Sequence, residues 1–86
     1  MIMNEGQNAK SYYAYIFGNP CDPMSYYKTS IKPEFGVGNI LCAIYATGAG
    51  THPDKFSEEL EGYIADALMS GISQPQTGET VVFMRY

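Results

Sequence analysis

The second half of the chain carries the pattern that most restricts its fold. Residues 40–46 form an apolar run, a glycine-containing turn follows, and residues 80–86 form a second run rich in β-branched and aromatic residues. Between the two runs, apolar side chains recur at helical spacing: Phe56, Leu60, Tyr63, Ile64, Ala67 and Leu68. A strand, a helix and a strand in this order predict a β-α-β unit, with a right-handed crossover and two parallel strands in one sheet.

The residues around the predicted helix indicate where it begins and ends. Thr51 or Asp54 can cap its N-terminus, and Pro53 suits a position in the first turn. Gly71 is expected to end the helix, because glycine adopts the left-handed conformation that a helix C-terminus often requires.

The first half of the chain is less regular. Residues 11–17 are rich in aromatic residues and predict a strand. Two prolines between residues 18 and 23 exclude a helix or a central strand there. Residues 24–39 show no clear period, and a short strand can lie within residues 26–31. We therefore predict an α+β fold, a small three- to four-stranded sheet in the order β-β-α-β with one amphipathic helix packed on one face.

Length and charge limit the domain organisation and the partners. A chain of 86 residues forms a single domain with a small core, predicted over residues 11–86 after a flexible N-terminal arm of residues 1–10. The net charge is −4 and the five basic side chains are scattered, which disfavours direct nucleic-acid binding. No apolar run reaches the roughly 20 residues that span a bilayer. Residues 1–10 are polar and lack the apolar core of a signal peptide, so we expect a cytoplasmic protein if the chain starts as written, or an exported one if it is a processed form.

The two cysteines are candidates for a disulfide. A bridge between Cys21 and Cys42 would close a loop of about twenty residues and contribute about 3 kcal/mol in the chain-entropy model. It would also indicate an oxidising compartment. The alternative is a buried Cys42 that packs like alanine and a free, exposed Cys21.

No pattern in the sequence predicts catalysis, a cofactor or a metal ion. His52 is the single histidine, and no two candidate ligands have metal-binding spacing. Residues 48–51 contain two glycines before the helix, but both the dinucleotide fingerprint and the phosphate-binding loop are absent. The carboxylates of residues 58–66 are expected to lie on the solvated face of the helix. We therefore expect that the protein is not an enzyme.

The most suggestive side chains are the aromatic ones. Eight tyrosines are many for this length, and tyrosine combines a rigid apolar ring with a polar tip, which suits contact surfaces. We predict an interaction surface made of two tyrosine doublets and one phenylalanine: Tyr12, Tyr13, Tyr26, Tyr27 and Phe35. A tyrosine in the core with a bonded hydroxyl is the alternative for each.

Three short segments, residues 21–23, 38–46 and 62–68, resemble small uncharacterised proteins of Bacteroidetes-type bacteria. Those proteins have an aromatic strand, a proline-rich loop, a strand similar to residues 41–44, an amphipathic helix and a final apolar strand. The resemblance covers residues 11–86. It implies an envelope or extracellular setting and no specific activity.

These observations favour a non-enzymatic interaction or structural module. We expect a subunit or accessory of a cell-envelope or surface assembly that acts through protein partners, in a larger complex or a homo-oligomer. The expected location is periplasmic, outer-membrane-associated or extracellular. The alternatives are a cytoplasmic or phage-encoded inhibitor that blocks a larger enzyme, and a small-ligand or sugar binder that uses the tyrosine-rich loop.

Overall fold

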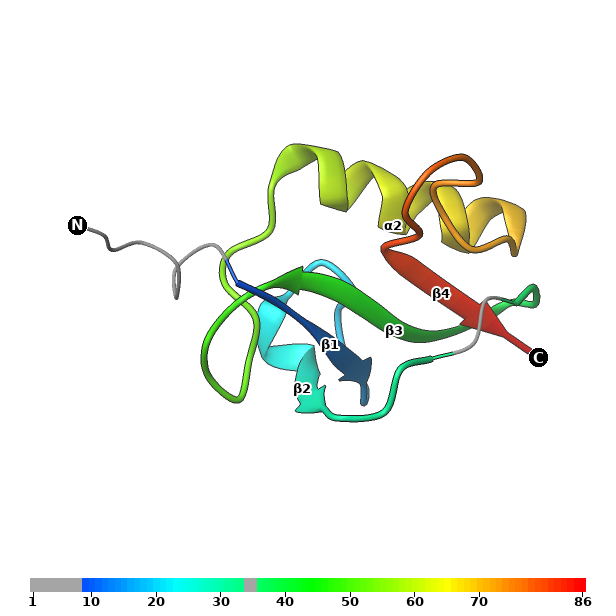
Figure 1. Ribbon diagram of the computed structural model, residues 1–86. Coiled ribbons are helices and arrows are strands. Elements are labelled where there is room, and N and C mark those ends of the chain that lie inside the picture. The colour runs from blue at the N-terminus through cyan, green and yellow to red at the C-terminus, as the bar shows by residue number, and fades with distance from the viewer. Residues whose placement is uncertain (1–8, 34–35) are drawn as a thin grey trace.

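The computed structural model describes residues 9–33 and 36–86. It contains one four-stranded sheet with an α-helix along one face (Figure 1). The elements in chain order are β1 (Lys10–Tyr15), the 3₁₀ helix η1 (Pro23–Ser25), β2 (Tyr26–Thr29), β3 (Ile40–Thr47), α2 (Glu58–Ser70) and β4 (Val82–Arg85). The predicted small α+β fold is confirmed, including the short strand within residues 26–31. Of the predicted N-terminal arm, residues 1–8 lie outside the described residues, and Lys10 already belongs to β1.

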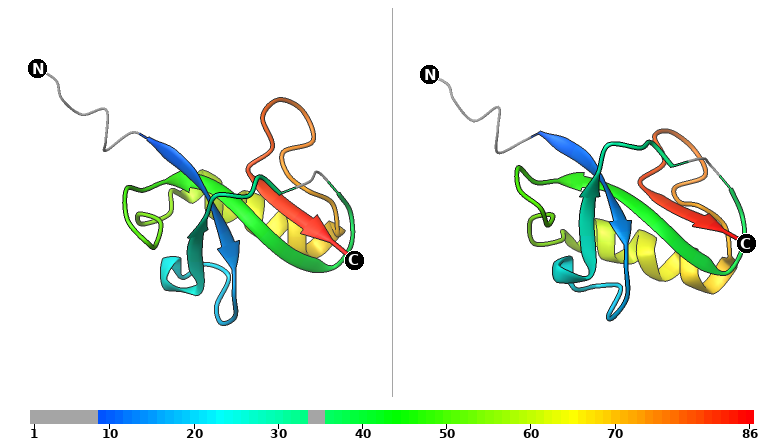
Figure 2. Two further views of the ribbon diagram at one scale, coloured as in Figure 1. Left: turned by 60° about the horizontal axis from the view of Figure 1, so that its bottom comes forward. Right: turned by 90° about the horizontal axis from the view of Figure 1, so that it is seen from below.

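The strands lie in the order β2-β1-β3-β4, and every neighbouring pair is antiparallel (Figure 2). The prediction of parallel strands on either side of the helix is therefore wrong. The reason lies between α2 and β4, where Ile72 bridges to Val37 and Gln74 pairs with Val82. The segment around Gln74 thus runs alongside β4 in the opposite direction, and the chain reverses again before β4 begins. As a result, β4 is antiparallel to β3.

The pairing register assigns the side chains to the two faces of the sheet. Residues directly opposite each other share a face, and Tyr13, Ile44 and Val82 lie opposite one another across β1, β3 and β4. A register shift between Leu41 and Ala43 leaves an extra residue in β3. Such a bulge changes the alternation, which explains why Leu41 joins the same core as Ile44 although the two are three positions apart in the chain.

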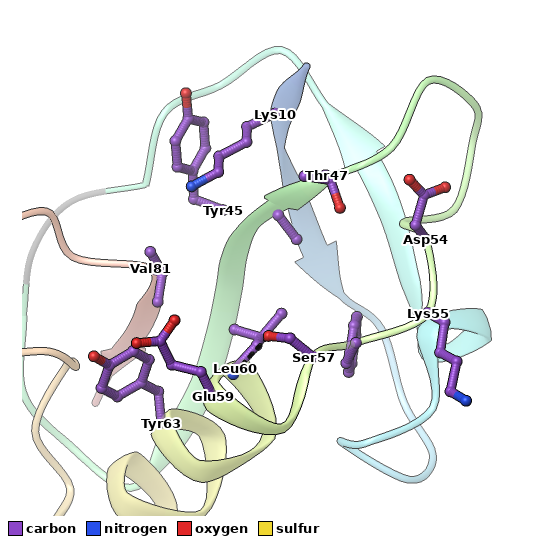
Figure 3. A pocket seen from close by; sticks show the side chains of 12 residues that line it. Lys10, Tyr45, Thr47, Asp54, Lys55, Ser57, Glu59, Leu60, Tyr63 and Val81 are labelled. Carbon is purple, nitrogen blue, oxygen red and sulfur yellow. Dashed lines mark hydrogen bonds between the residues drawn. The ribbon is translucent and has the colours of Figure 1, made fainter. Parts of the chain in front are cut away.

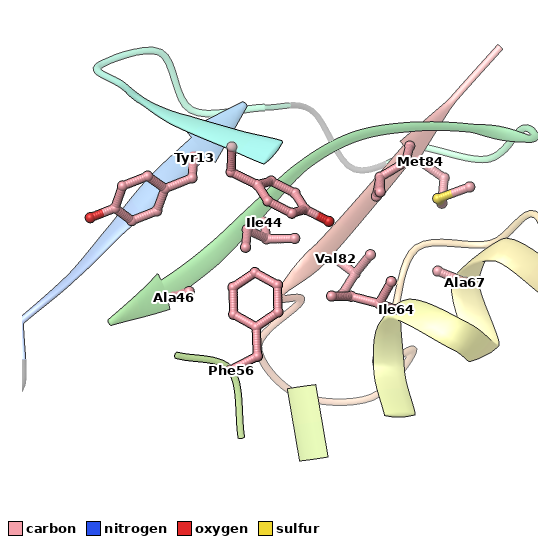
Figure 4. Packing of buried hydrophobic residues seen from close by; sticks show 10 residues of the cluster. Tyr13, Ile44, Ala46, Phe56, Ile64, Ala67, Val82 and Met84 are labelled. Carbon is pink, nitrogen blue, oxygen red and sulfur yellow. The ribbon is translucent and has the colours of Figure 1, made fainter. Parts of the chain in front are cut away.

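The core lies between this face and α2. Ile64 and Ala67 of the helix and Phe56 of the preceding loop pack against the strand residues (Figure 4). The full cluster of buried residues is Tyr13, Tyr26, Leu41, Ile44, Ala46, Phe56, Ile64, Ala67, Val82 and Met84. The helical spacing in the sequence therefore correctly predicts that Ile64 and Ala67 pack against the sheet from α2. Phe56 is also buried, but it lies in the connection that leads into α2.

Helix α2 begins later than predicted. Its N-cap is Ser57, whose Oγ accepts a hydrogen bond from the Leu60 amide at 3.1 Å. Thr51 and Asp54, the predicted caps, are used in the preceding turn: the Thr51 carbonyl accepts from the Lys28 amide at 2.8 Å. The predicted C-terminus is confirmed, because Gly71 ends the helix in the left-handed conformation with φ of 71°.

Both outer edges of the sheet are partly covered by other segments of the chain. On the β2 side, the Lys28 amide donates to the Thr51 carbonyl. On the β4 side, Val82 exchanges backbone hydrogen bonds with Gln74 at 2.9 and 2.8 Å, and the Met84 amide donates to Ser73 Oγ at 2.9 Å. Exposed edges are the sites where sheets pair with other chains, so this fold leaves little backbone free for strand addition at these positions.

The buried Ser73 links three segments. Besides accepting from the Met84 amide, its hydroxyl donates to the Gly36 carbonyl at 2.6 Å. Nearby, the Gly38 amide donates to the Gly71 carbonyl at 2.7 Å. Gly38 has φ of 135°, and a Cβ atom there would lie 2.2 Å from the Arg85 carbonyl oxygen. Only glycine therefore allows this close approach to β4.

Candidate functional site

The structure divides the four tyrosines of the predicted interaction surface between the two faces of the sheet. Tyr13 and Tyr26 are fully buried in the core, whereas Tyr12 is half-buried and Tyr27 is exposed. The single surface predicted from the two doublets is therefore wrong. Successive residues of a strand point to opposite faces, so a doublet necessarily separates its members. Phe35, the fifth predicted residue, lies outside the described residues.

Tyr26 is a structural anchor. Its hydroxyl donates to the Pro20 carbonyl at 2.7 Å, and its ring packs on Tyr15 and Phe56 with centroids 5.3 and 5.5 Å away. Burial, with smaller contributions from nearby Tyr15 and Cys21, raises the pKa of Tyr26 far above its ordinary value. A hydroxyl that resists ionisation and already has a partner does not suit proton transfer at neutral pH.

Tyr13 has the same kind of role at the other end of β1. Its hydroxyl donates to the Gly50 carbonyl at 3.3 Å, which ties the loop before α2 to the sheet. Burial and the Asp54 carboxylate raise the pKa of Tyr13, although a hydrogen bond with Ser11 opposes this shift. Both buried tyrosines thus stabilise the loops at the ends of the sheet.

On the face of the sheet opposite α2, aromatic rings pack together. The Tyr12 ring lies 4.5 Å from Tyr45 and 6.0 Å from Phe83 between centroids. The Lys10 ammonium lies 5.8 Å from the Tyr45 ring centroid. Tyr27 contacts His52 instead, at 4.6 Å between ring centroids.

The two cysteines are free thiols in the structure. Cys21 is exposed in the turn between β1 and β2, and Cys42 is half-buried at the bulge of β3. The predicted Cys21–Cys42 disulfide is therefore not formed. The turn that contains Cys21 is held by hydrogen bonds to the side chains of Asn19 and Asp22.

Within residues 9–33 and 36–86, no group of three or more histidine, cysteine or carboxylate side chains is placed to hold a metal ion. The Nδ1 atom of His52 lies 2.7 Å from the Tyr26 carbonyl oxygen, so this ring is engaged with β2.

One cavity lies between the end of β3 and the beginning of α2, and we call it the strand–helix cavity (Figure 3). It has a volume of about 220 Å³. Its lining combines apolar and aromatic side chains with charged ones: Lys10, Tyr45, Ala46, Thr47, Asp54, Lys55, Phe56, Ser57, Glu59, Leu60, Tyr63 and Val81. No pattern in the sequence predicts this site, because its residues come from four separate segments with no shared motif.

A second feature lies at the opposite end of β1, in the turn that leads to β2. Four apolar side chains are exposed around a groove of about 270 Å³, and we call them the turn cluster: Ile16, Phe17, Met24 and Tyr27. The side chains of Phe17 and Met24 are 76% and 62% exposed. In the sequence, the available signal for this surface was the apolar pair Ile16 and Phe17 before a proline-containing turn. Sequence alone does not distinguish such an exposed pair from residues of the core.

The backbone of this turn is well fixed. The Asp22 carboxylate accepts from the Met24 amide at 2.9 Å and so caps η1. Ser25 Oγ donates to the Asn19 carbonyl at 2.8 Å, and the Ile16 amide donates to the Ser25 carbonyl at 2.9 Å. The turn cluster is therefore presented on an organised scaffold.

Comparison with protein-family models, curated proteins and solved structures finds no match to this chain. Among the described residues, no helix has the length and apolar character needed to cross a membrane.

Proposed function

We propose that the protein is a non-enzymatic contact module that binds a partner protein through the turn cluster. The observation that supports this is the exposure of four adjacent apolar side chains on a turn whose backbone is fixed by hydrogen bonds. Contiguous exposed apolar surface in a small protein is typical of an interaction site. A fixed turn also lowers the entropy cost of binding.

The charge of the chain suggests the chemistry of the partner. The protein carries a net charge of −4, and the Asp22 carboxylate lines the groove of the turn cluster. Complementary charge speeds association and selects the partner. The partner we propose is therefore a different protein, with an apolar contact surface surrounded by basic side chains, because a second copy of this chain would bring like charges together.

The biological setting is a proposal that rests on the sequence. A subunit or accessory of a cell-envelope assembly, as the resemblance implies, would use the turn cluster as an assembly contact. An inhibitor of a larger enzyme would insert the same protruding turn into a cleft. The tyrosine-rich loop is less suited to sugar binding than expected, since Tyr26 lies in the core.

A crosslinking experiment with a matched control tests the proposal. The substitution Phe17→Ser removes the most exposed ring of the turn cluster, and Met69→Ser removes a side chain that is 86% exposed on α2. Chemical crosslinking in native extract, followed by mass spectrometry, should give one reproducible protein partner with wild type and Met69→Ser but not with Phe17→Ser. The crosslink should weaken at high salt, as expected for a basic partner.

Two results would contradict this proposal. A partner retained equally by all three forms would place the contact elsewhere. A wild-type protein that elutes as a dimer, which Phe17→Ser converts to a monomer, would show that the turn cluster binds a second copy instead.

A further inference from the structure

The strand–helix cavity is separate from the turn cluster and needs its own explanation. Lys10 lies at the start of β1, whereas the turn cluster follows the end of the same strand. None of the residues that line the cavity belongs to the turn cluster. An inference about the cavity therefore does not depend on the proposed function.

The size of the cavity limits what it can hold. Drug-sized ligands occupy pockets of roughly 300–1,000 Å³, and a buried cavity of about 150 Å³ is known to accommodate benzene. A volume of about 220 Å³ therefore suits a molecule with one ring or one branched chain and a small polar group.

The lining provides an apolar surface for the body of such a molecule. Leu60 and Tyr63 come from successive turns of α2, and Val81 comes from the segment before β4. All three are only half-buried although they pack against the core. An apolar ligand would thus cover surface that the fold leaves partly exposed, and removing apolar surface from water is favourable.

The charged side chains are distributed on two walls. Figure 3 shows Lys10 beside Tyr45 on the strand side and Glu59 beside Tyr63 on the helix side, while Lys55 points away from these residues. Asp54 also lines the cavity, on the side away from Tyr45 and Tyr63 (Figure 3). Near these two tyrosines the cavity thus offers one ammonium group and one carboxylate to an occupant.

The Lys10 ammonium is held by a weak contact. Its distance of 5.8 Å to the Tyr45 ring centroid is near the limit of about 6 Å for a cation–π interaction. Exposed interactions of this kind contribute little to stability. Lys10 can therefore turn to a carboxylate of a ligand at small cost, and a charge-assisted hydrogen bond would be the stronger contact.

We propose that the strand–helix cavity binds a small zwitterion with an apolar body, such as a free amino acid with an aromatic or branched side chain. Lys10 pairs with the carboxylate of the ligand and Glu59 with its ammonium group. The apolar side chain of the ligand packs on Leu60, Tyr63 and Val81. Neither an amine nor an acid alone uses both walls, so the zwitterion is the preferred occupant.

A titration followed by NMR tests this proposal with three probes of similar shape. Phenylalanine carries both charges, phenethylamine lacks the carboxylate, and hydrocinnamate lacks the ammonium group. Phenylalanine should shift the backbone amide signals of Tyr45, Leu60 and Val81 and should bind at least about tenfold more tightly than either analogue. The NMR spectra recorded for such titrations also show whether each substituted protein is folded.

Variants with matched controls identify the contacts. Lys10→Met and Glu59→Gln should each weaken phenylalanine binding about tenfold, the effect of losing one charged partner. Lys32→Met and Glu58→Gln, at exposed positions outside the lining, should leave the affinity unchanged within about twofold. Three results would overturn the proposal: no shifts with phenylalanine, shifts confined to other regions, or binding of phenethylamine or hydrocinnamate as tight as that of phenylalanine. Loss of the partner contact in Phe17→Ser would leave this titration unaffected, so the two proposals fail independently.

Discussion

At the scale of single residues, buried polar groups decide how the segments are held together. The hydroxyl of Ser73 serves two backbone groups from different parts of the chain, the Met84 amide and the Gly36 carbonyl. The hydroxyl of Tyr26 fixes the turn before β2 through the Pro20 carbonyl. Neither side chain lines the strand–helix cavity or belongs to the turn cluster, so substitutions of either should act on stability.

We expect Ser73→Ala to lower the free energy of unfolding by about 1–3 kcal/mol, because the Met84 amide would lose its acceptor inside the protein. Urea unfolding followed by circular dichroism measures this change. Ser30→Ala, at an exposed position after β2, is the control and should change stability by less than about 0.5 kcal/mol. Equal stability of wild type and Ser73→Ala would show that the hydrogen bonds of Ser73 contribute nothing net.

Tyr26 makes the stability dependent on alkaline pH. Burial raises the pKa of Tyr26 above its ordinary value of 10.0 in the folded state, so the unfolded chain releases this proton first. The contribution of Tyr26 to the free energy of unfolding is therefore complete below pH 10 and declines as the pH rises further. Unfolding in urea between pH 8 and about 11 should show falling stability, and Tyr26→Phe should fall less steeply. An identical pH profile in wild type and variant would exclude Tyr26 as the source.

At the scale of elements, Gly62 within α2 and Gly71 at the C-terminal end of this helix have opposite roles. Gly62 lies within the helix on its exposed side, and a Cβ atom there would meet no atom within 4 Å. Gly71 ends the helix in the left-handed region, and a Cβ atom there would lie 3.3 Å from the Gly38 carbonyl oxygen. The same substitution should therefore have opposite effects at the two positions.

Gly62→Ala should raise the free energy of unfolding by about 0.5–1 kcal/mol, because alanine restricts the unfolded chain and favours the helix. Gly71→Ala should lower it by about 1–2 kcal/mol, because an L-residue is strained in the left-handed conformation. Thermal unfolding of the two variants beside wild type measures both. A stabilising Gly71→Ala would contradict the described end of α2.

At the scale of the whole molecule, the free thiols report on the fold. Cys21 is exposed and Cys42 is half-buried in the central part of the sheet. We expect a thiol reagent to label Cys21 rapidly in the native protein and Cys42 more slowly, with both labelled in urea. Mass spectrometry of the labelled protein separates the two. An unlabelled protein whose mass rises on reduction would instead demonstrate the disulfide considered from the sequence.

Much of the local structure could be predicted from the sequence. Alternating and helical patterns depend on residues close in the chain, so they located β1, β3, the packed face of α2 and its end at Gly71. The short strand within residues 26–31 was suggested because a structureless loop as long as residues 24–39 is uncommon in a compact domain. The start of α2 was placed too early, because Thr51 and Asp54 are good caps in isolation but bond to other segments in the fold.

The direction of β4 and the identity of the sites depended on contacts between distant segments. Residues 72–74 have no apolar period, yet their pass along β4 makes the whole sheet antiparallel. Likewise, alternation separates Tyr12 from Tyr13 but does not say which face α2 covers. The sequence alone determined the elements, since these follow from neighbouring residues. Only the tertiary structure decided which tyrosines are buried, which apolar side chains remain exposed, and that Lys10 and Glu59 share one cavity, because each of these depends on pairings across many residues.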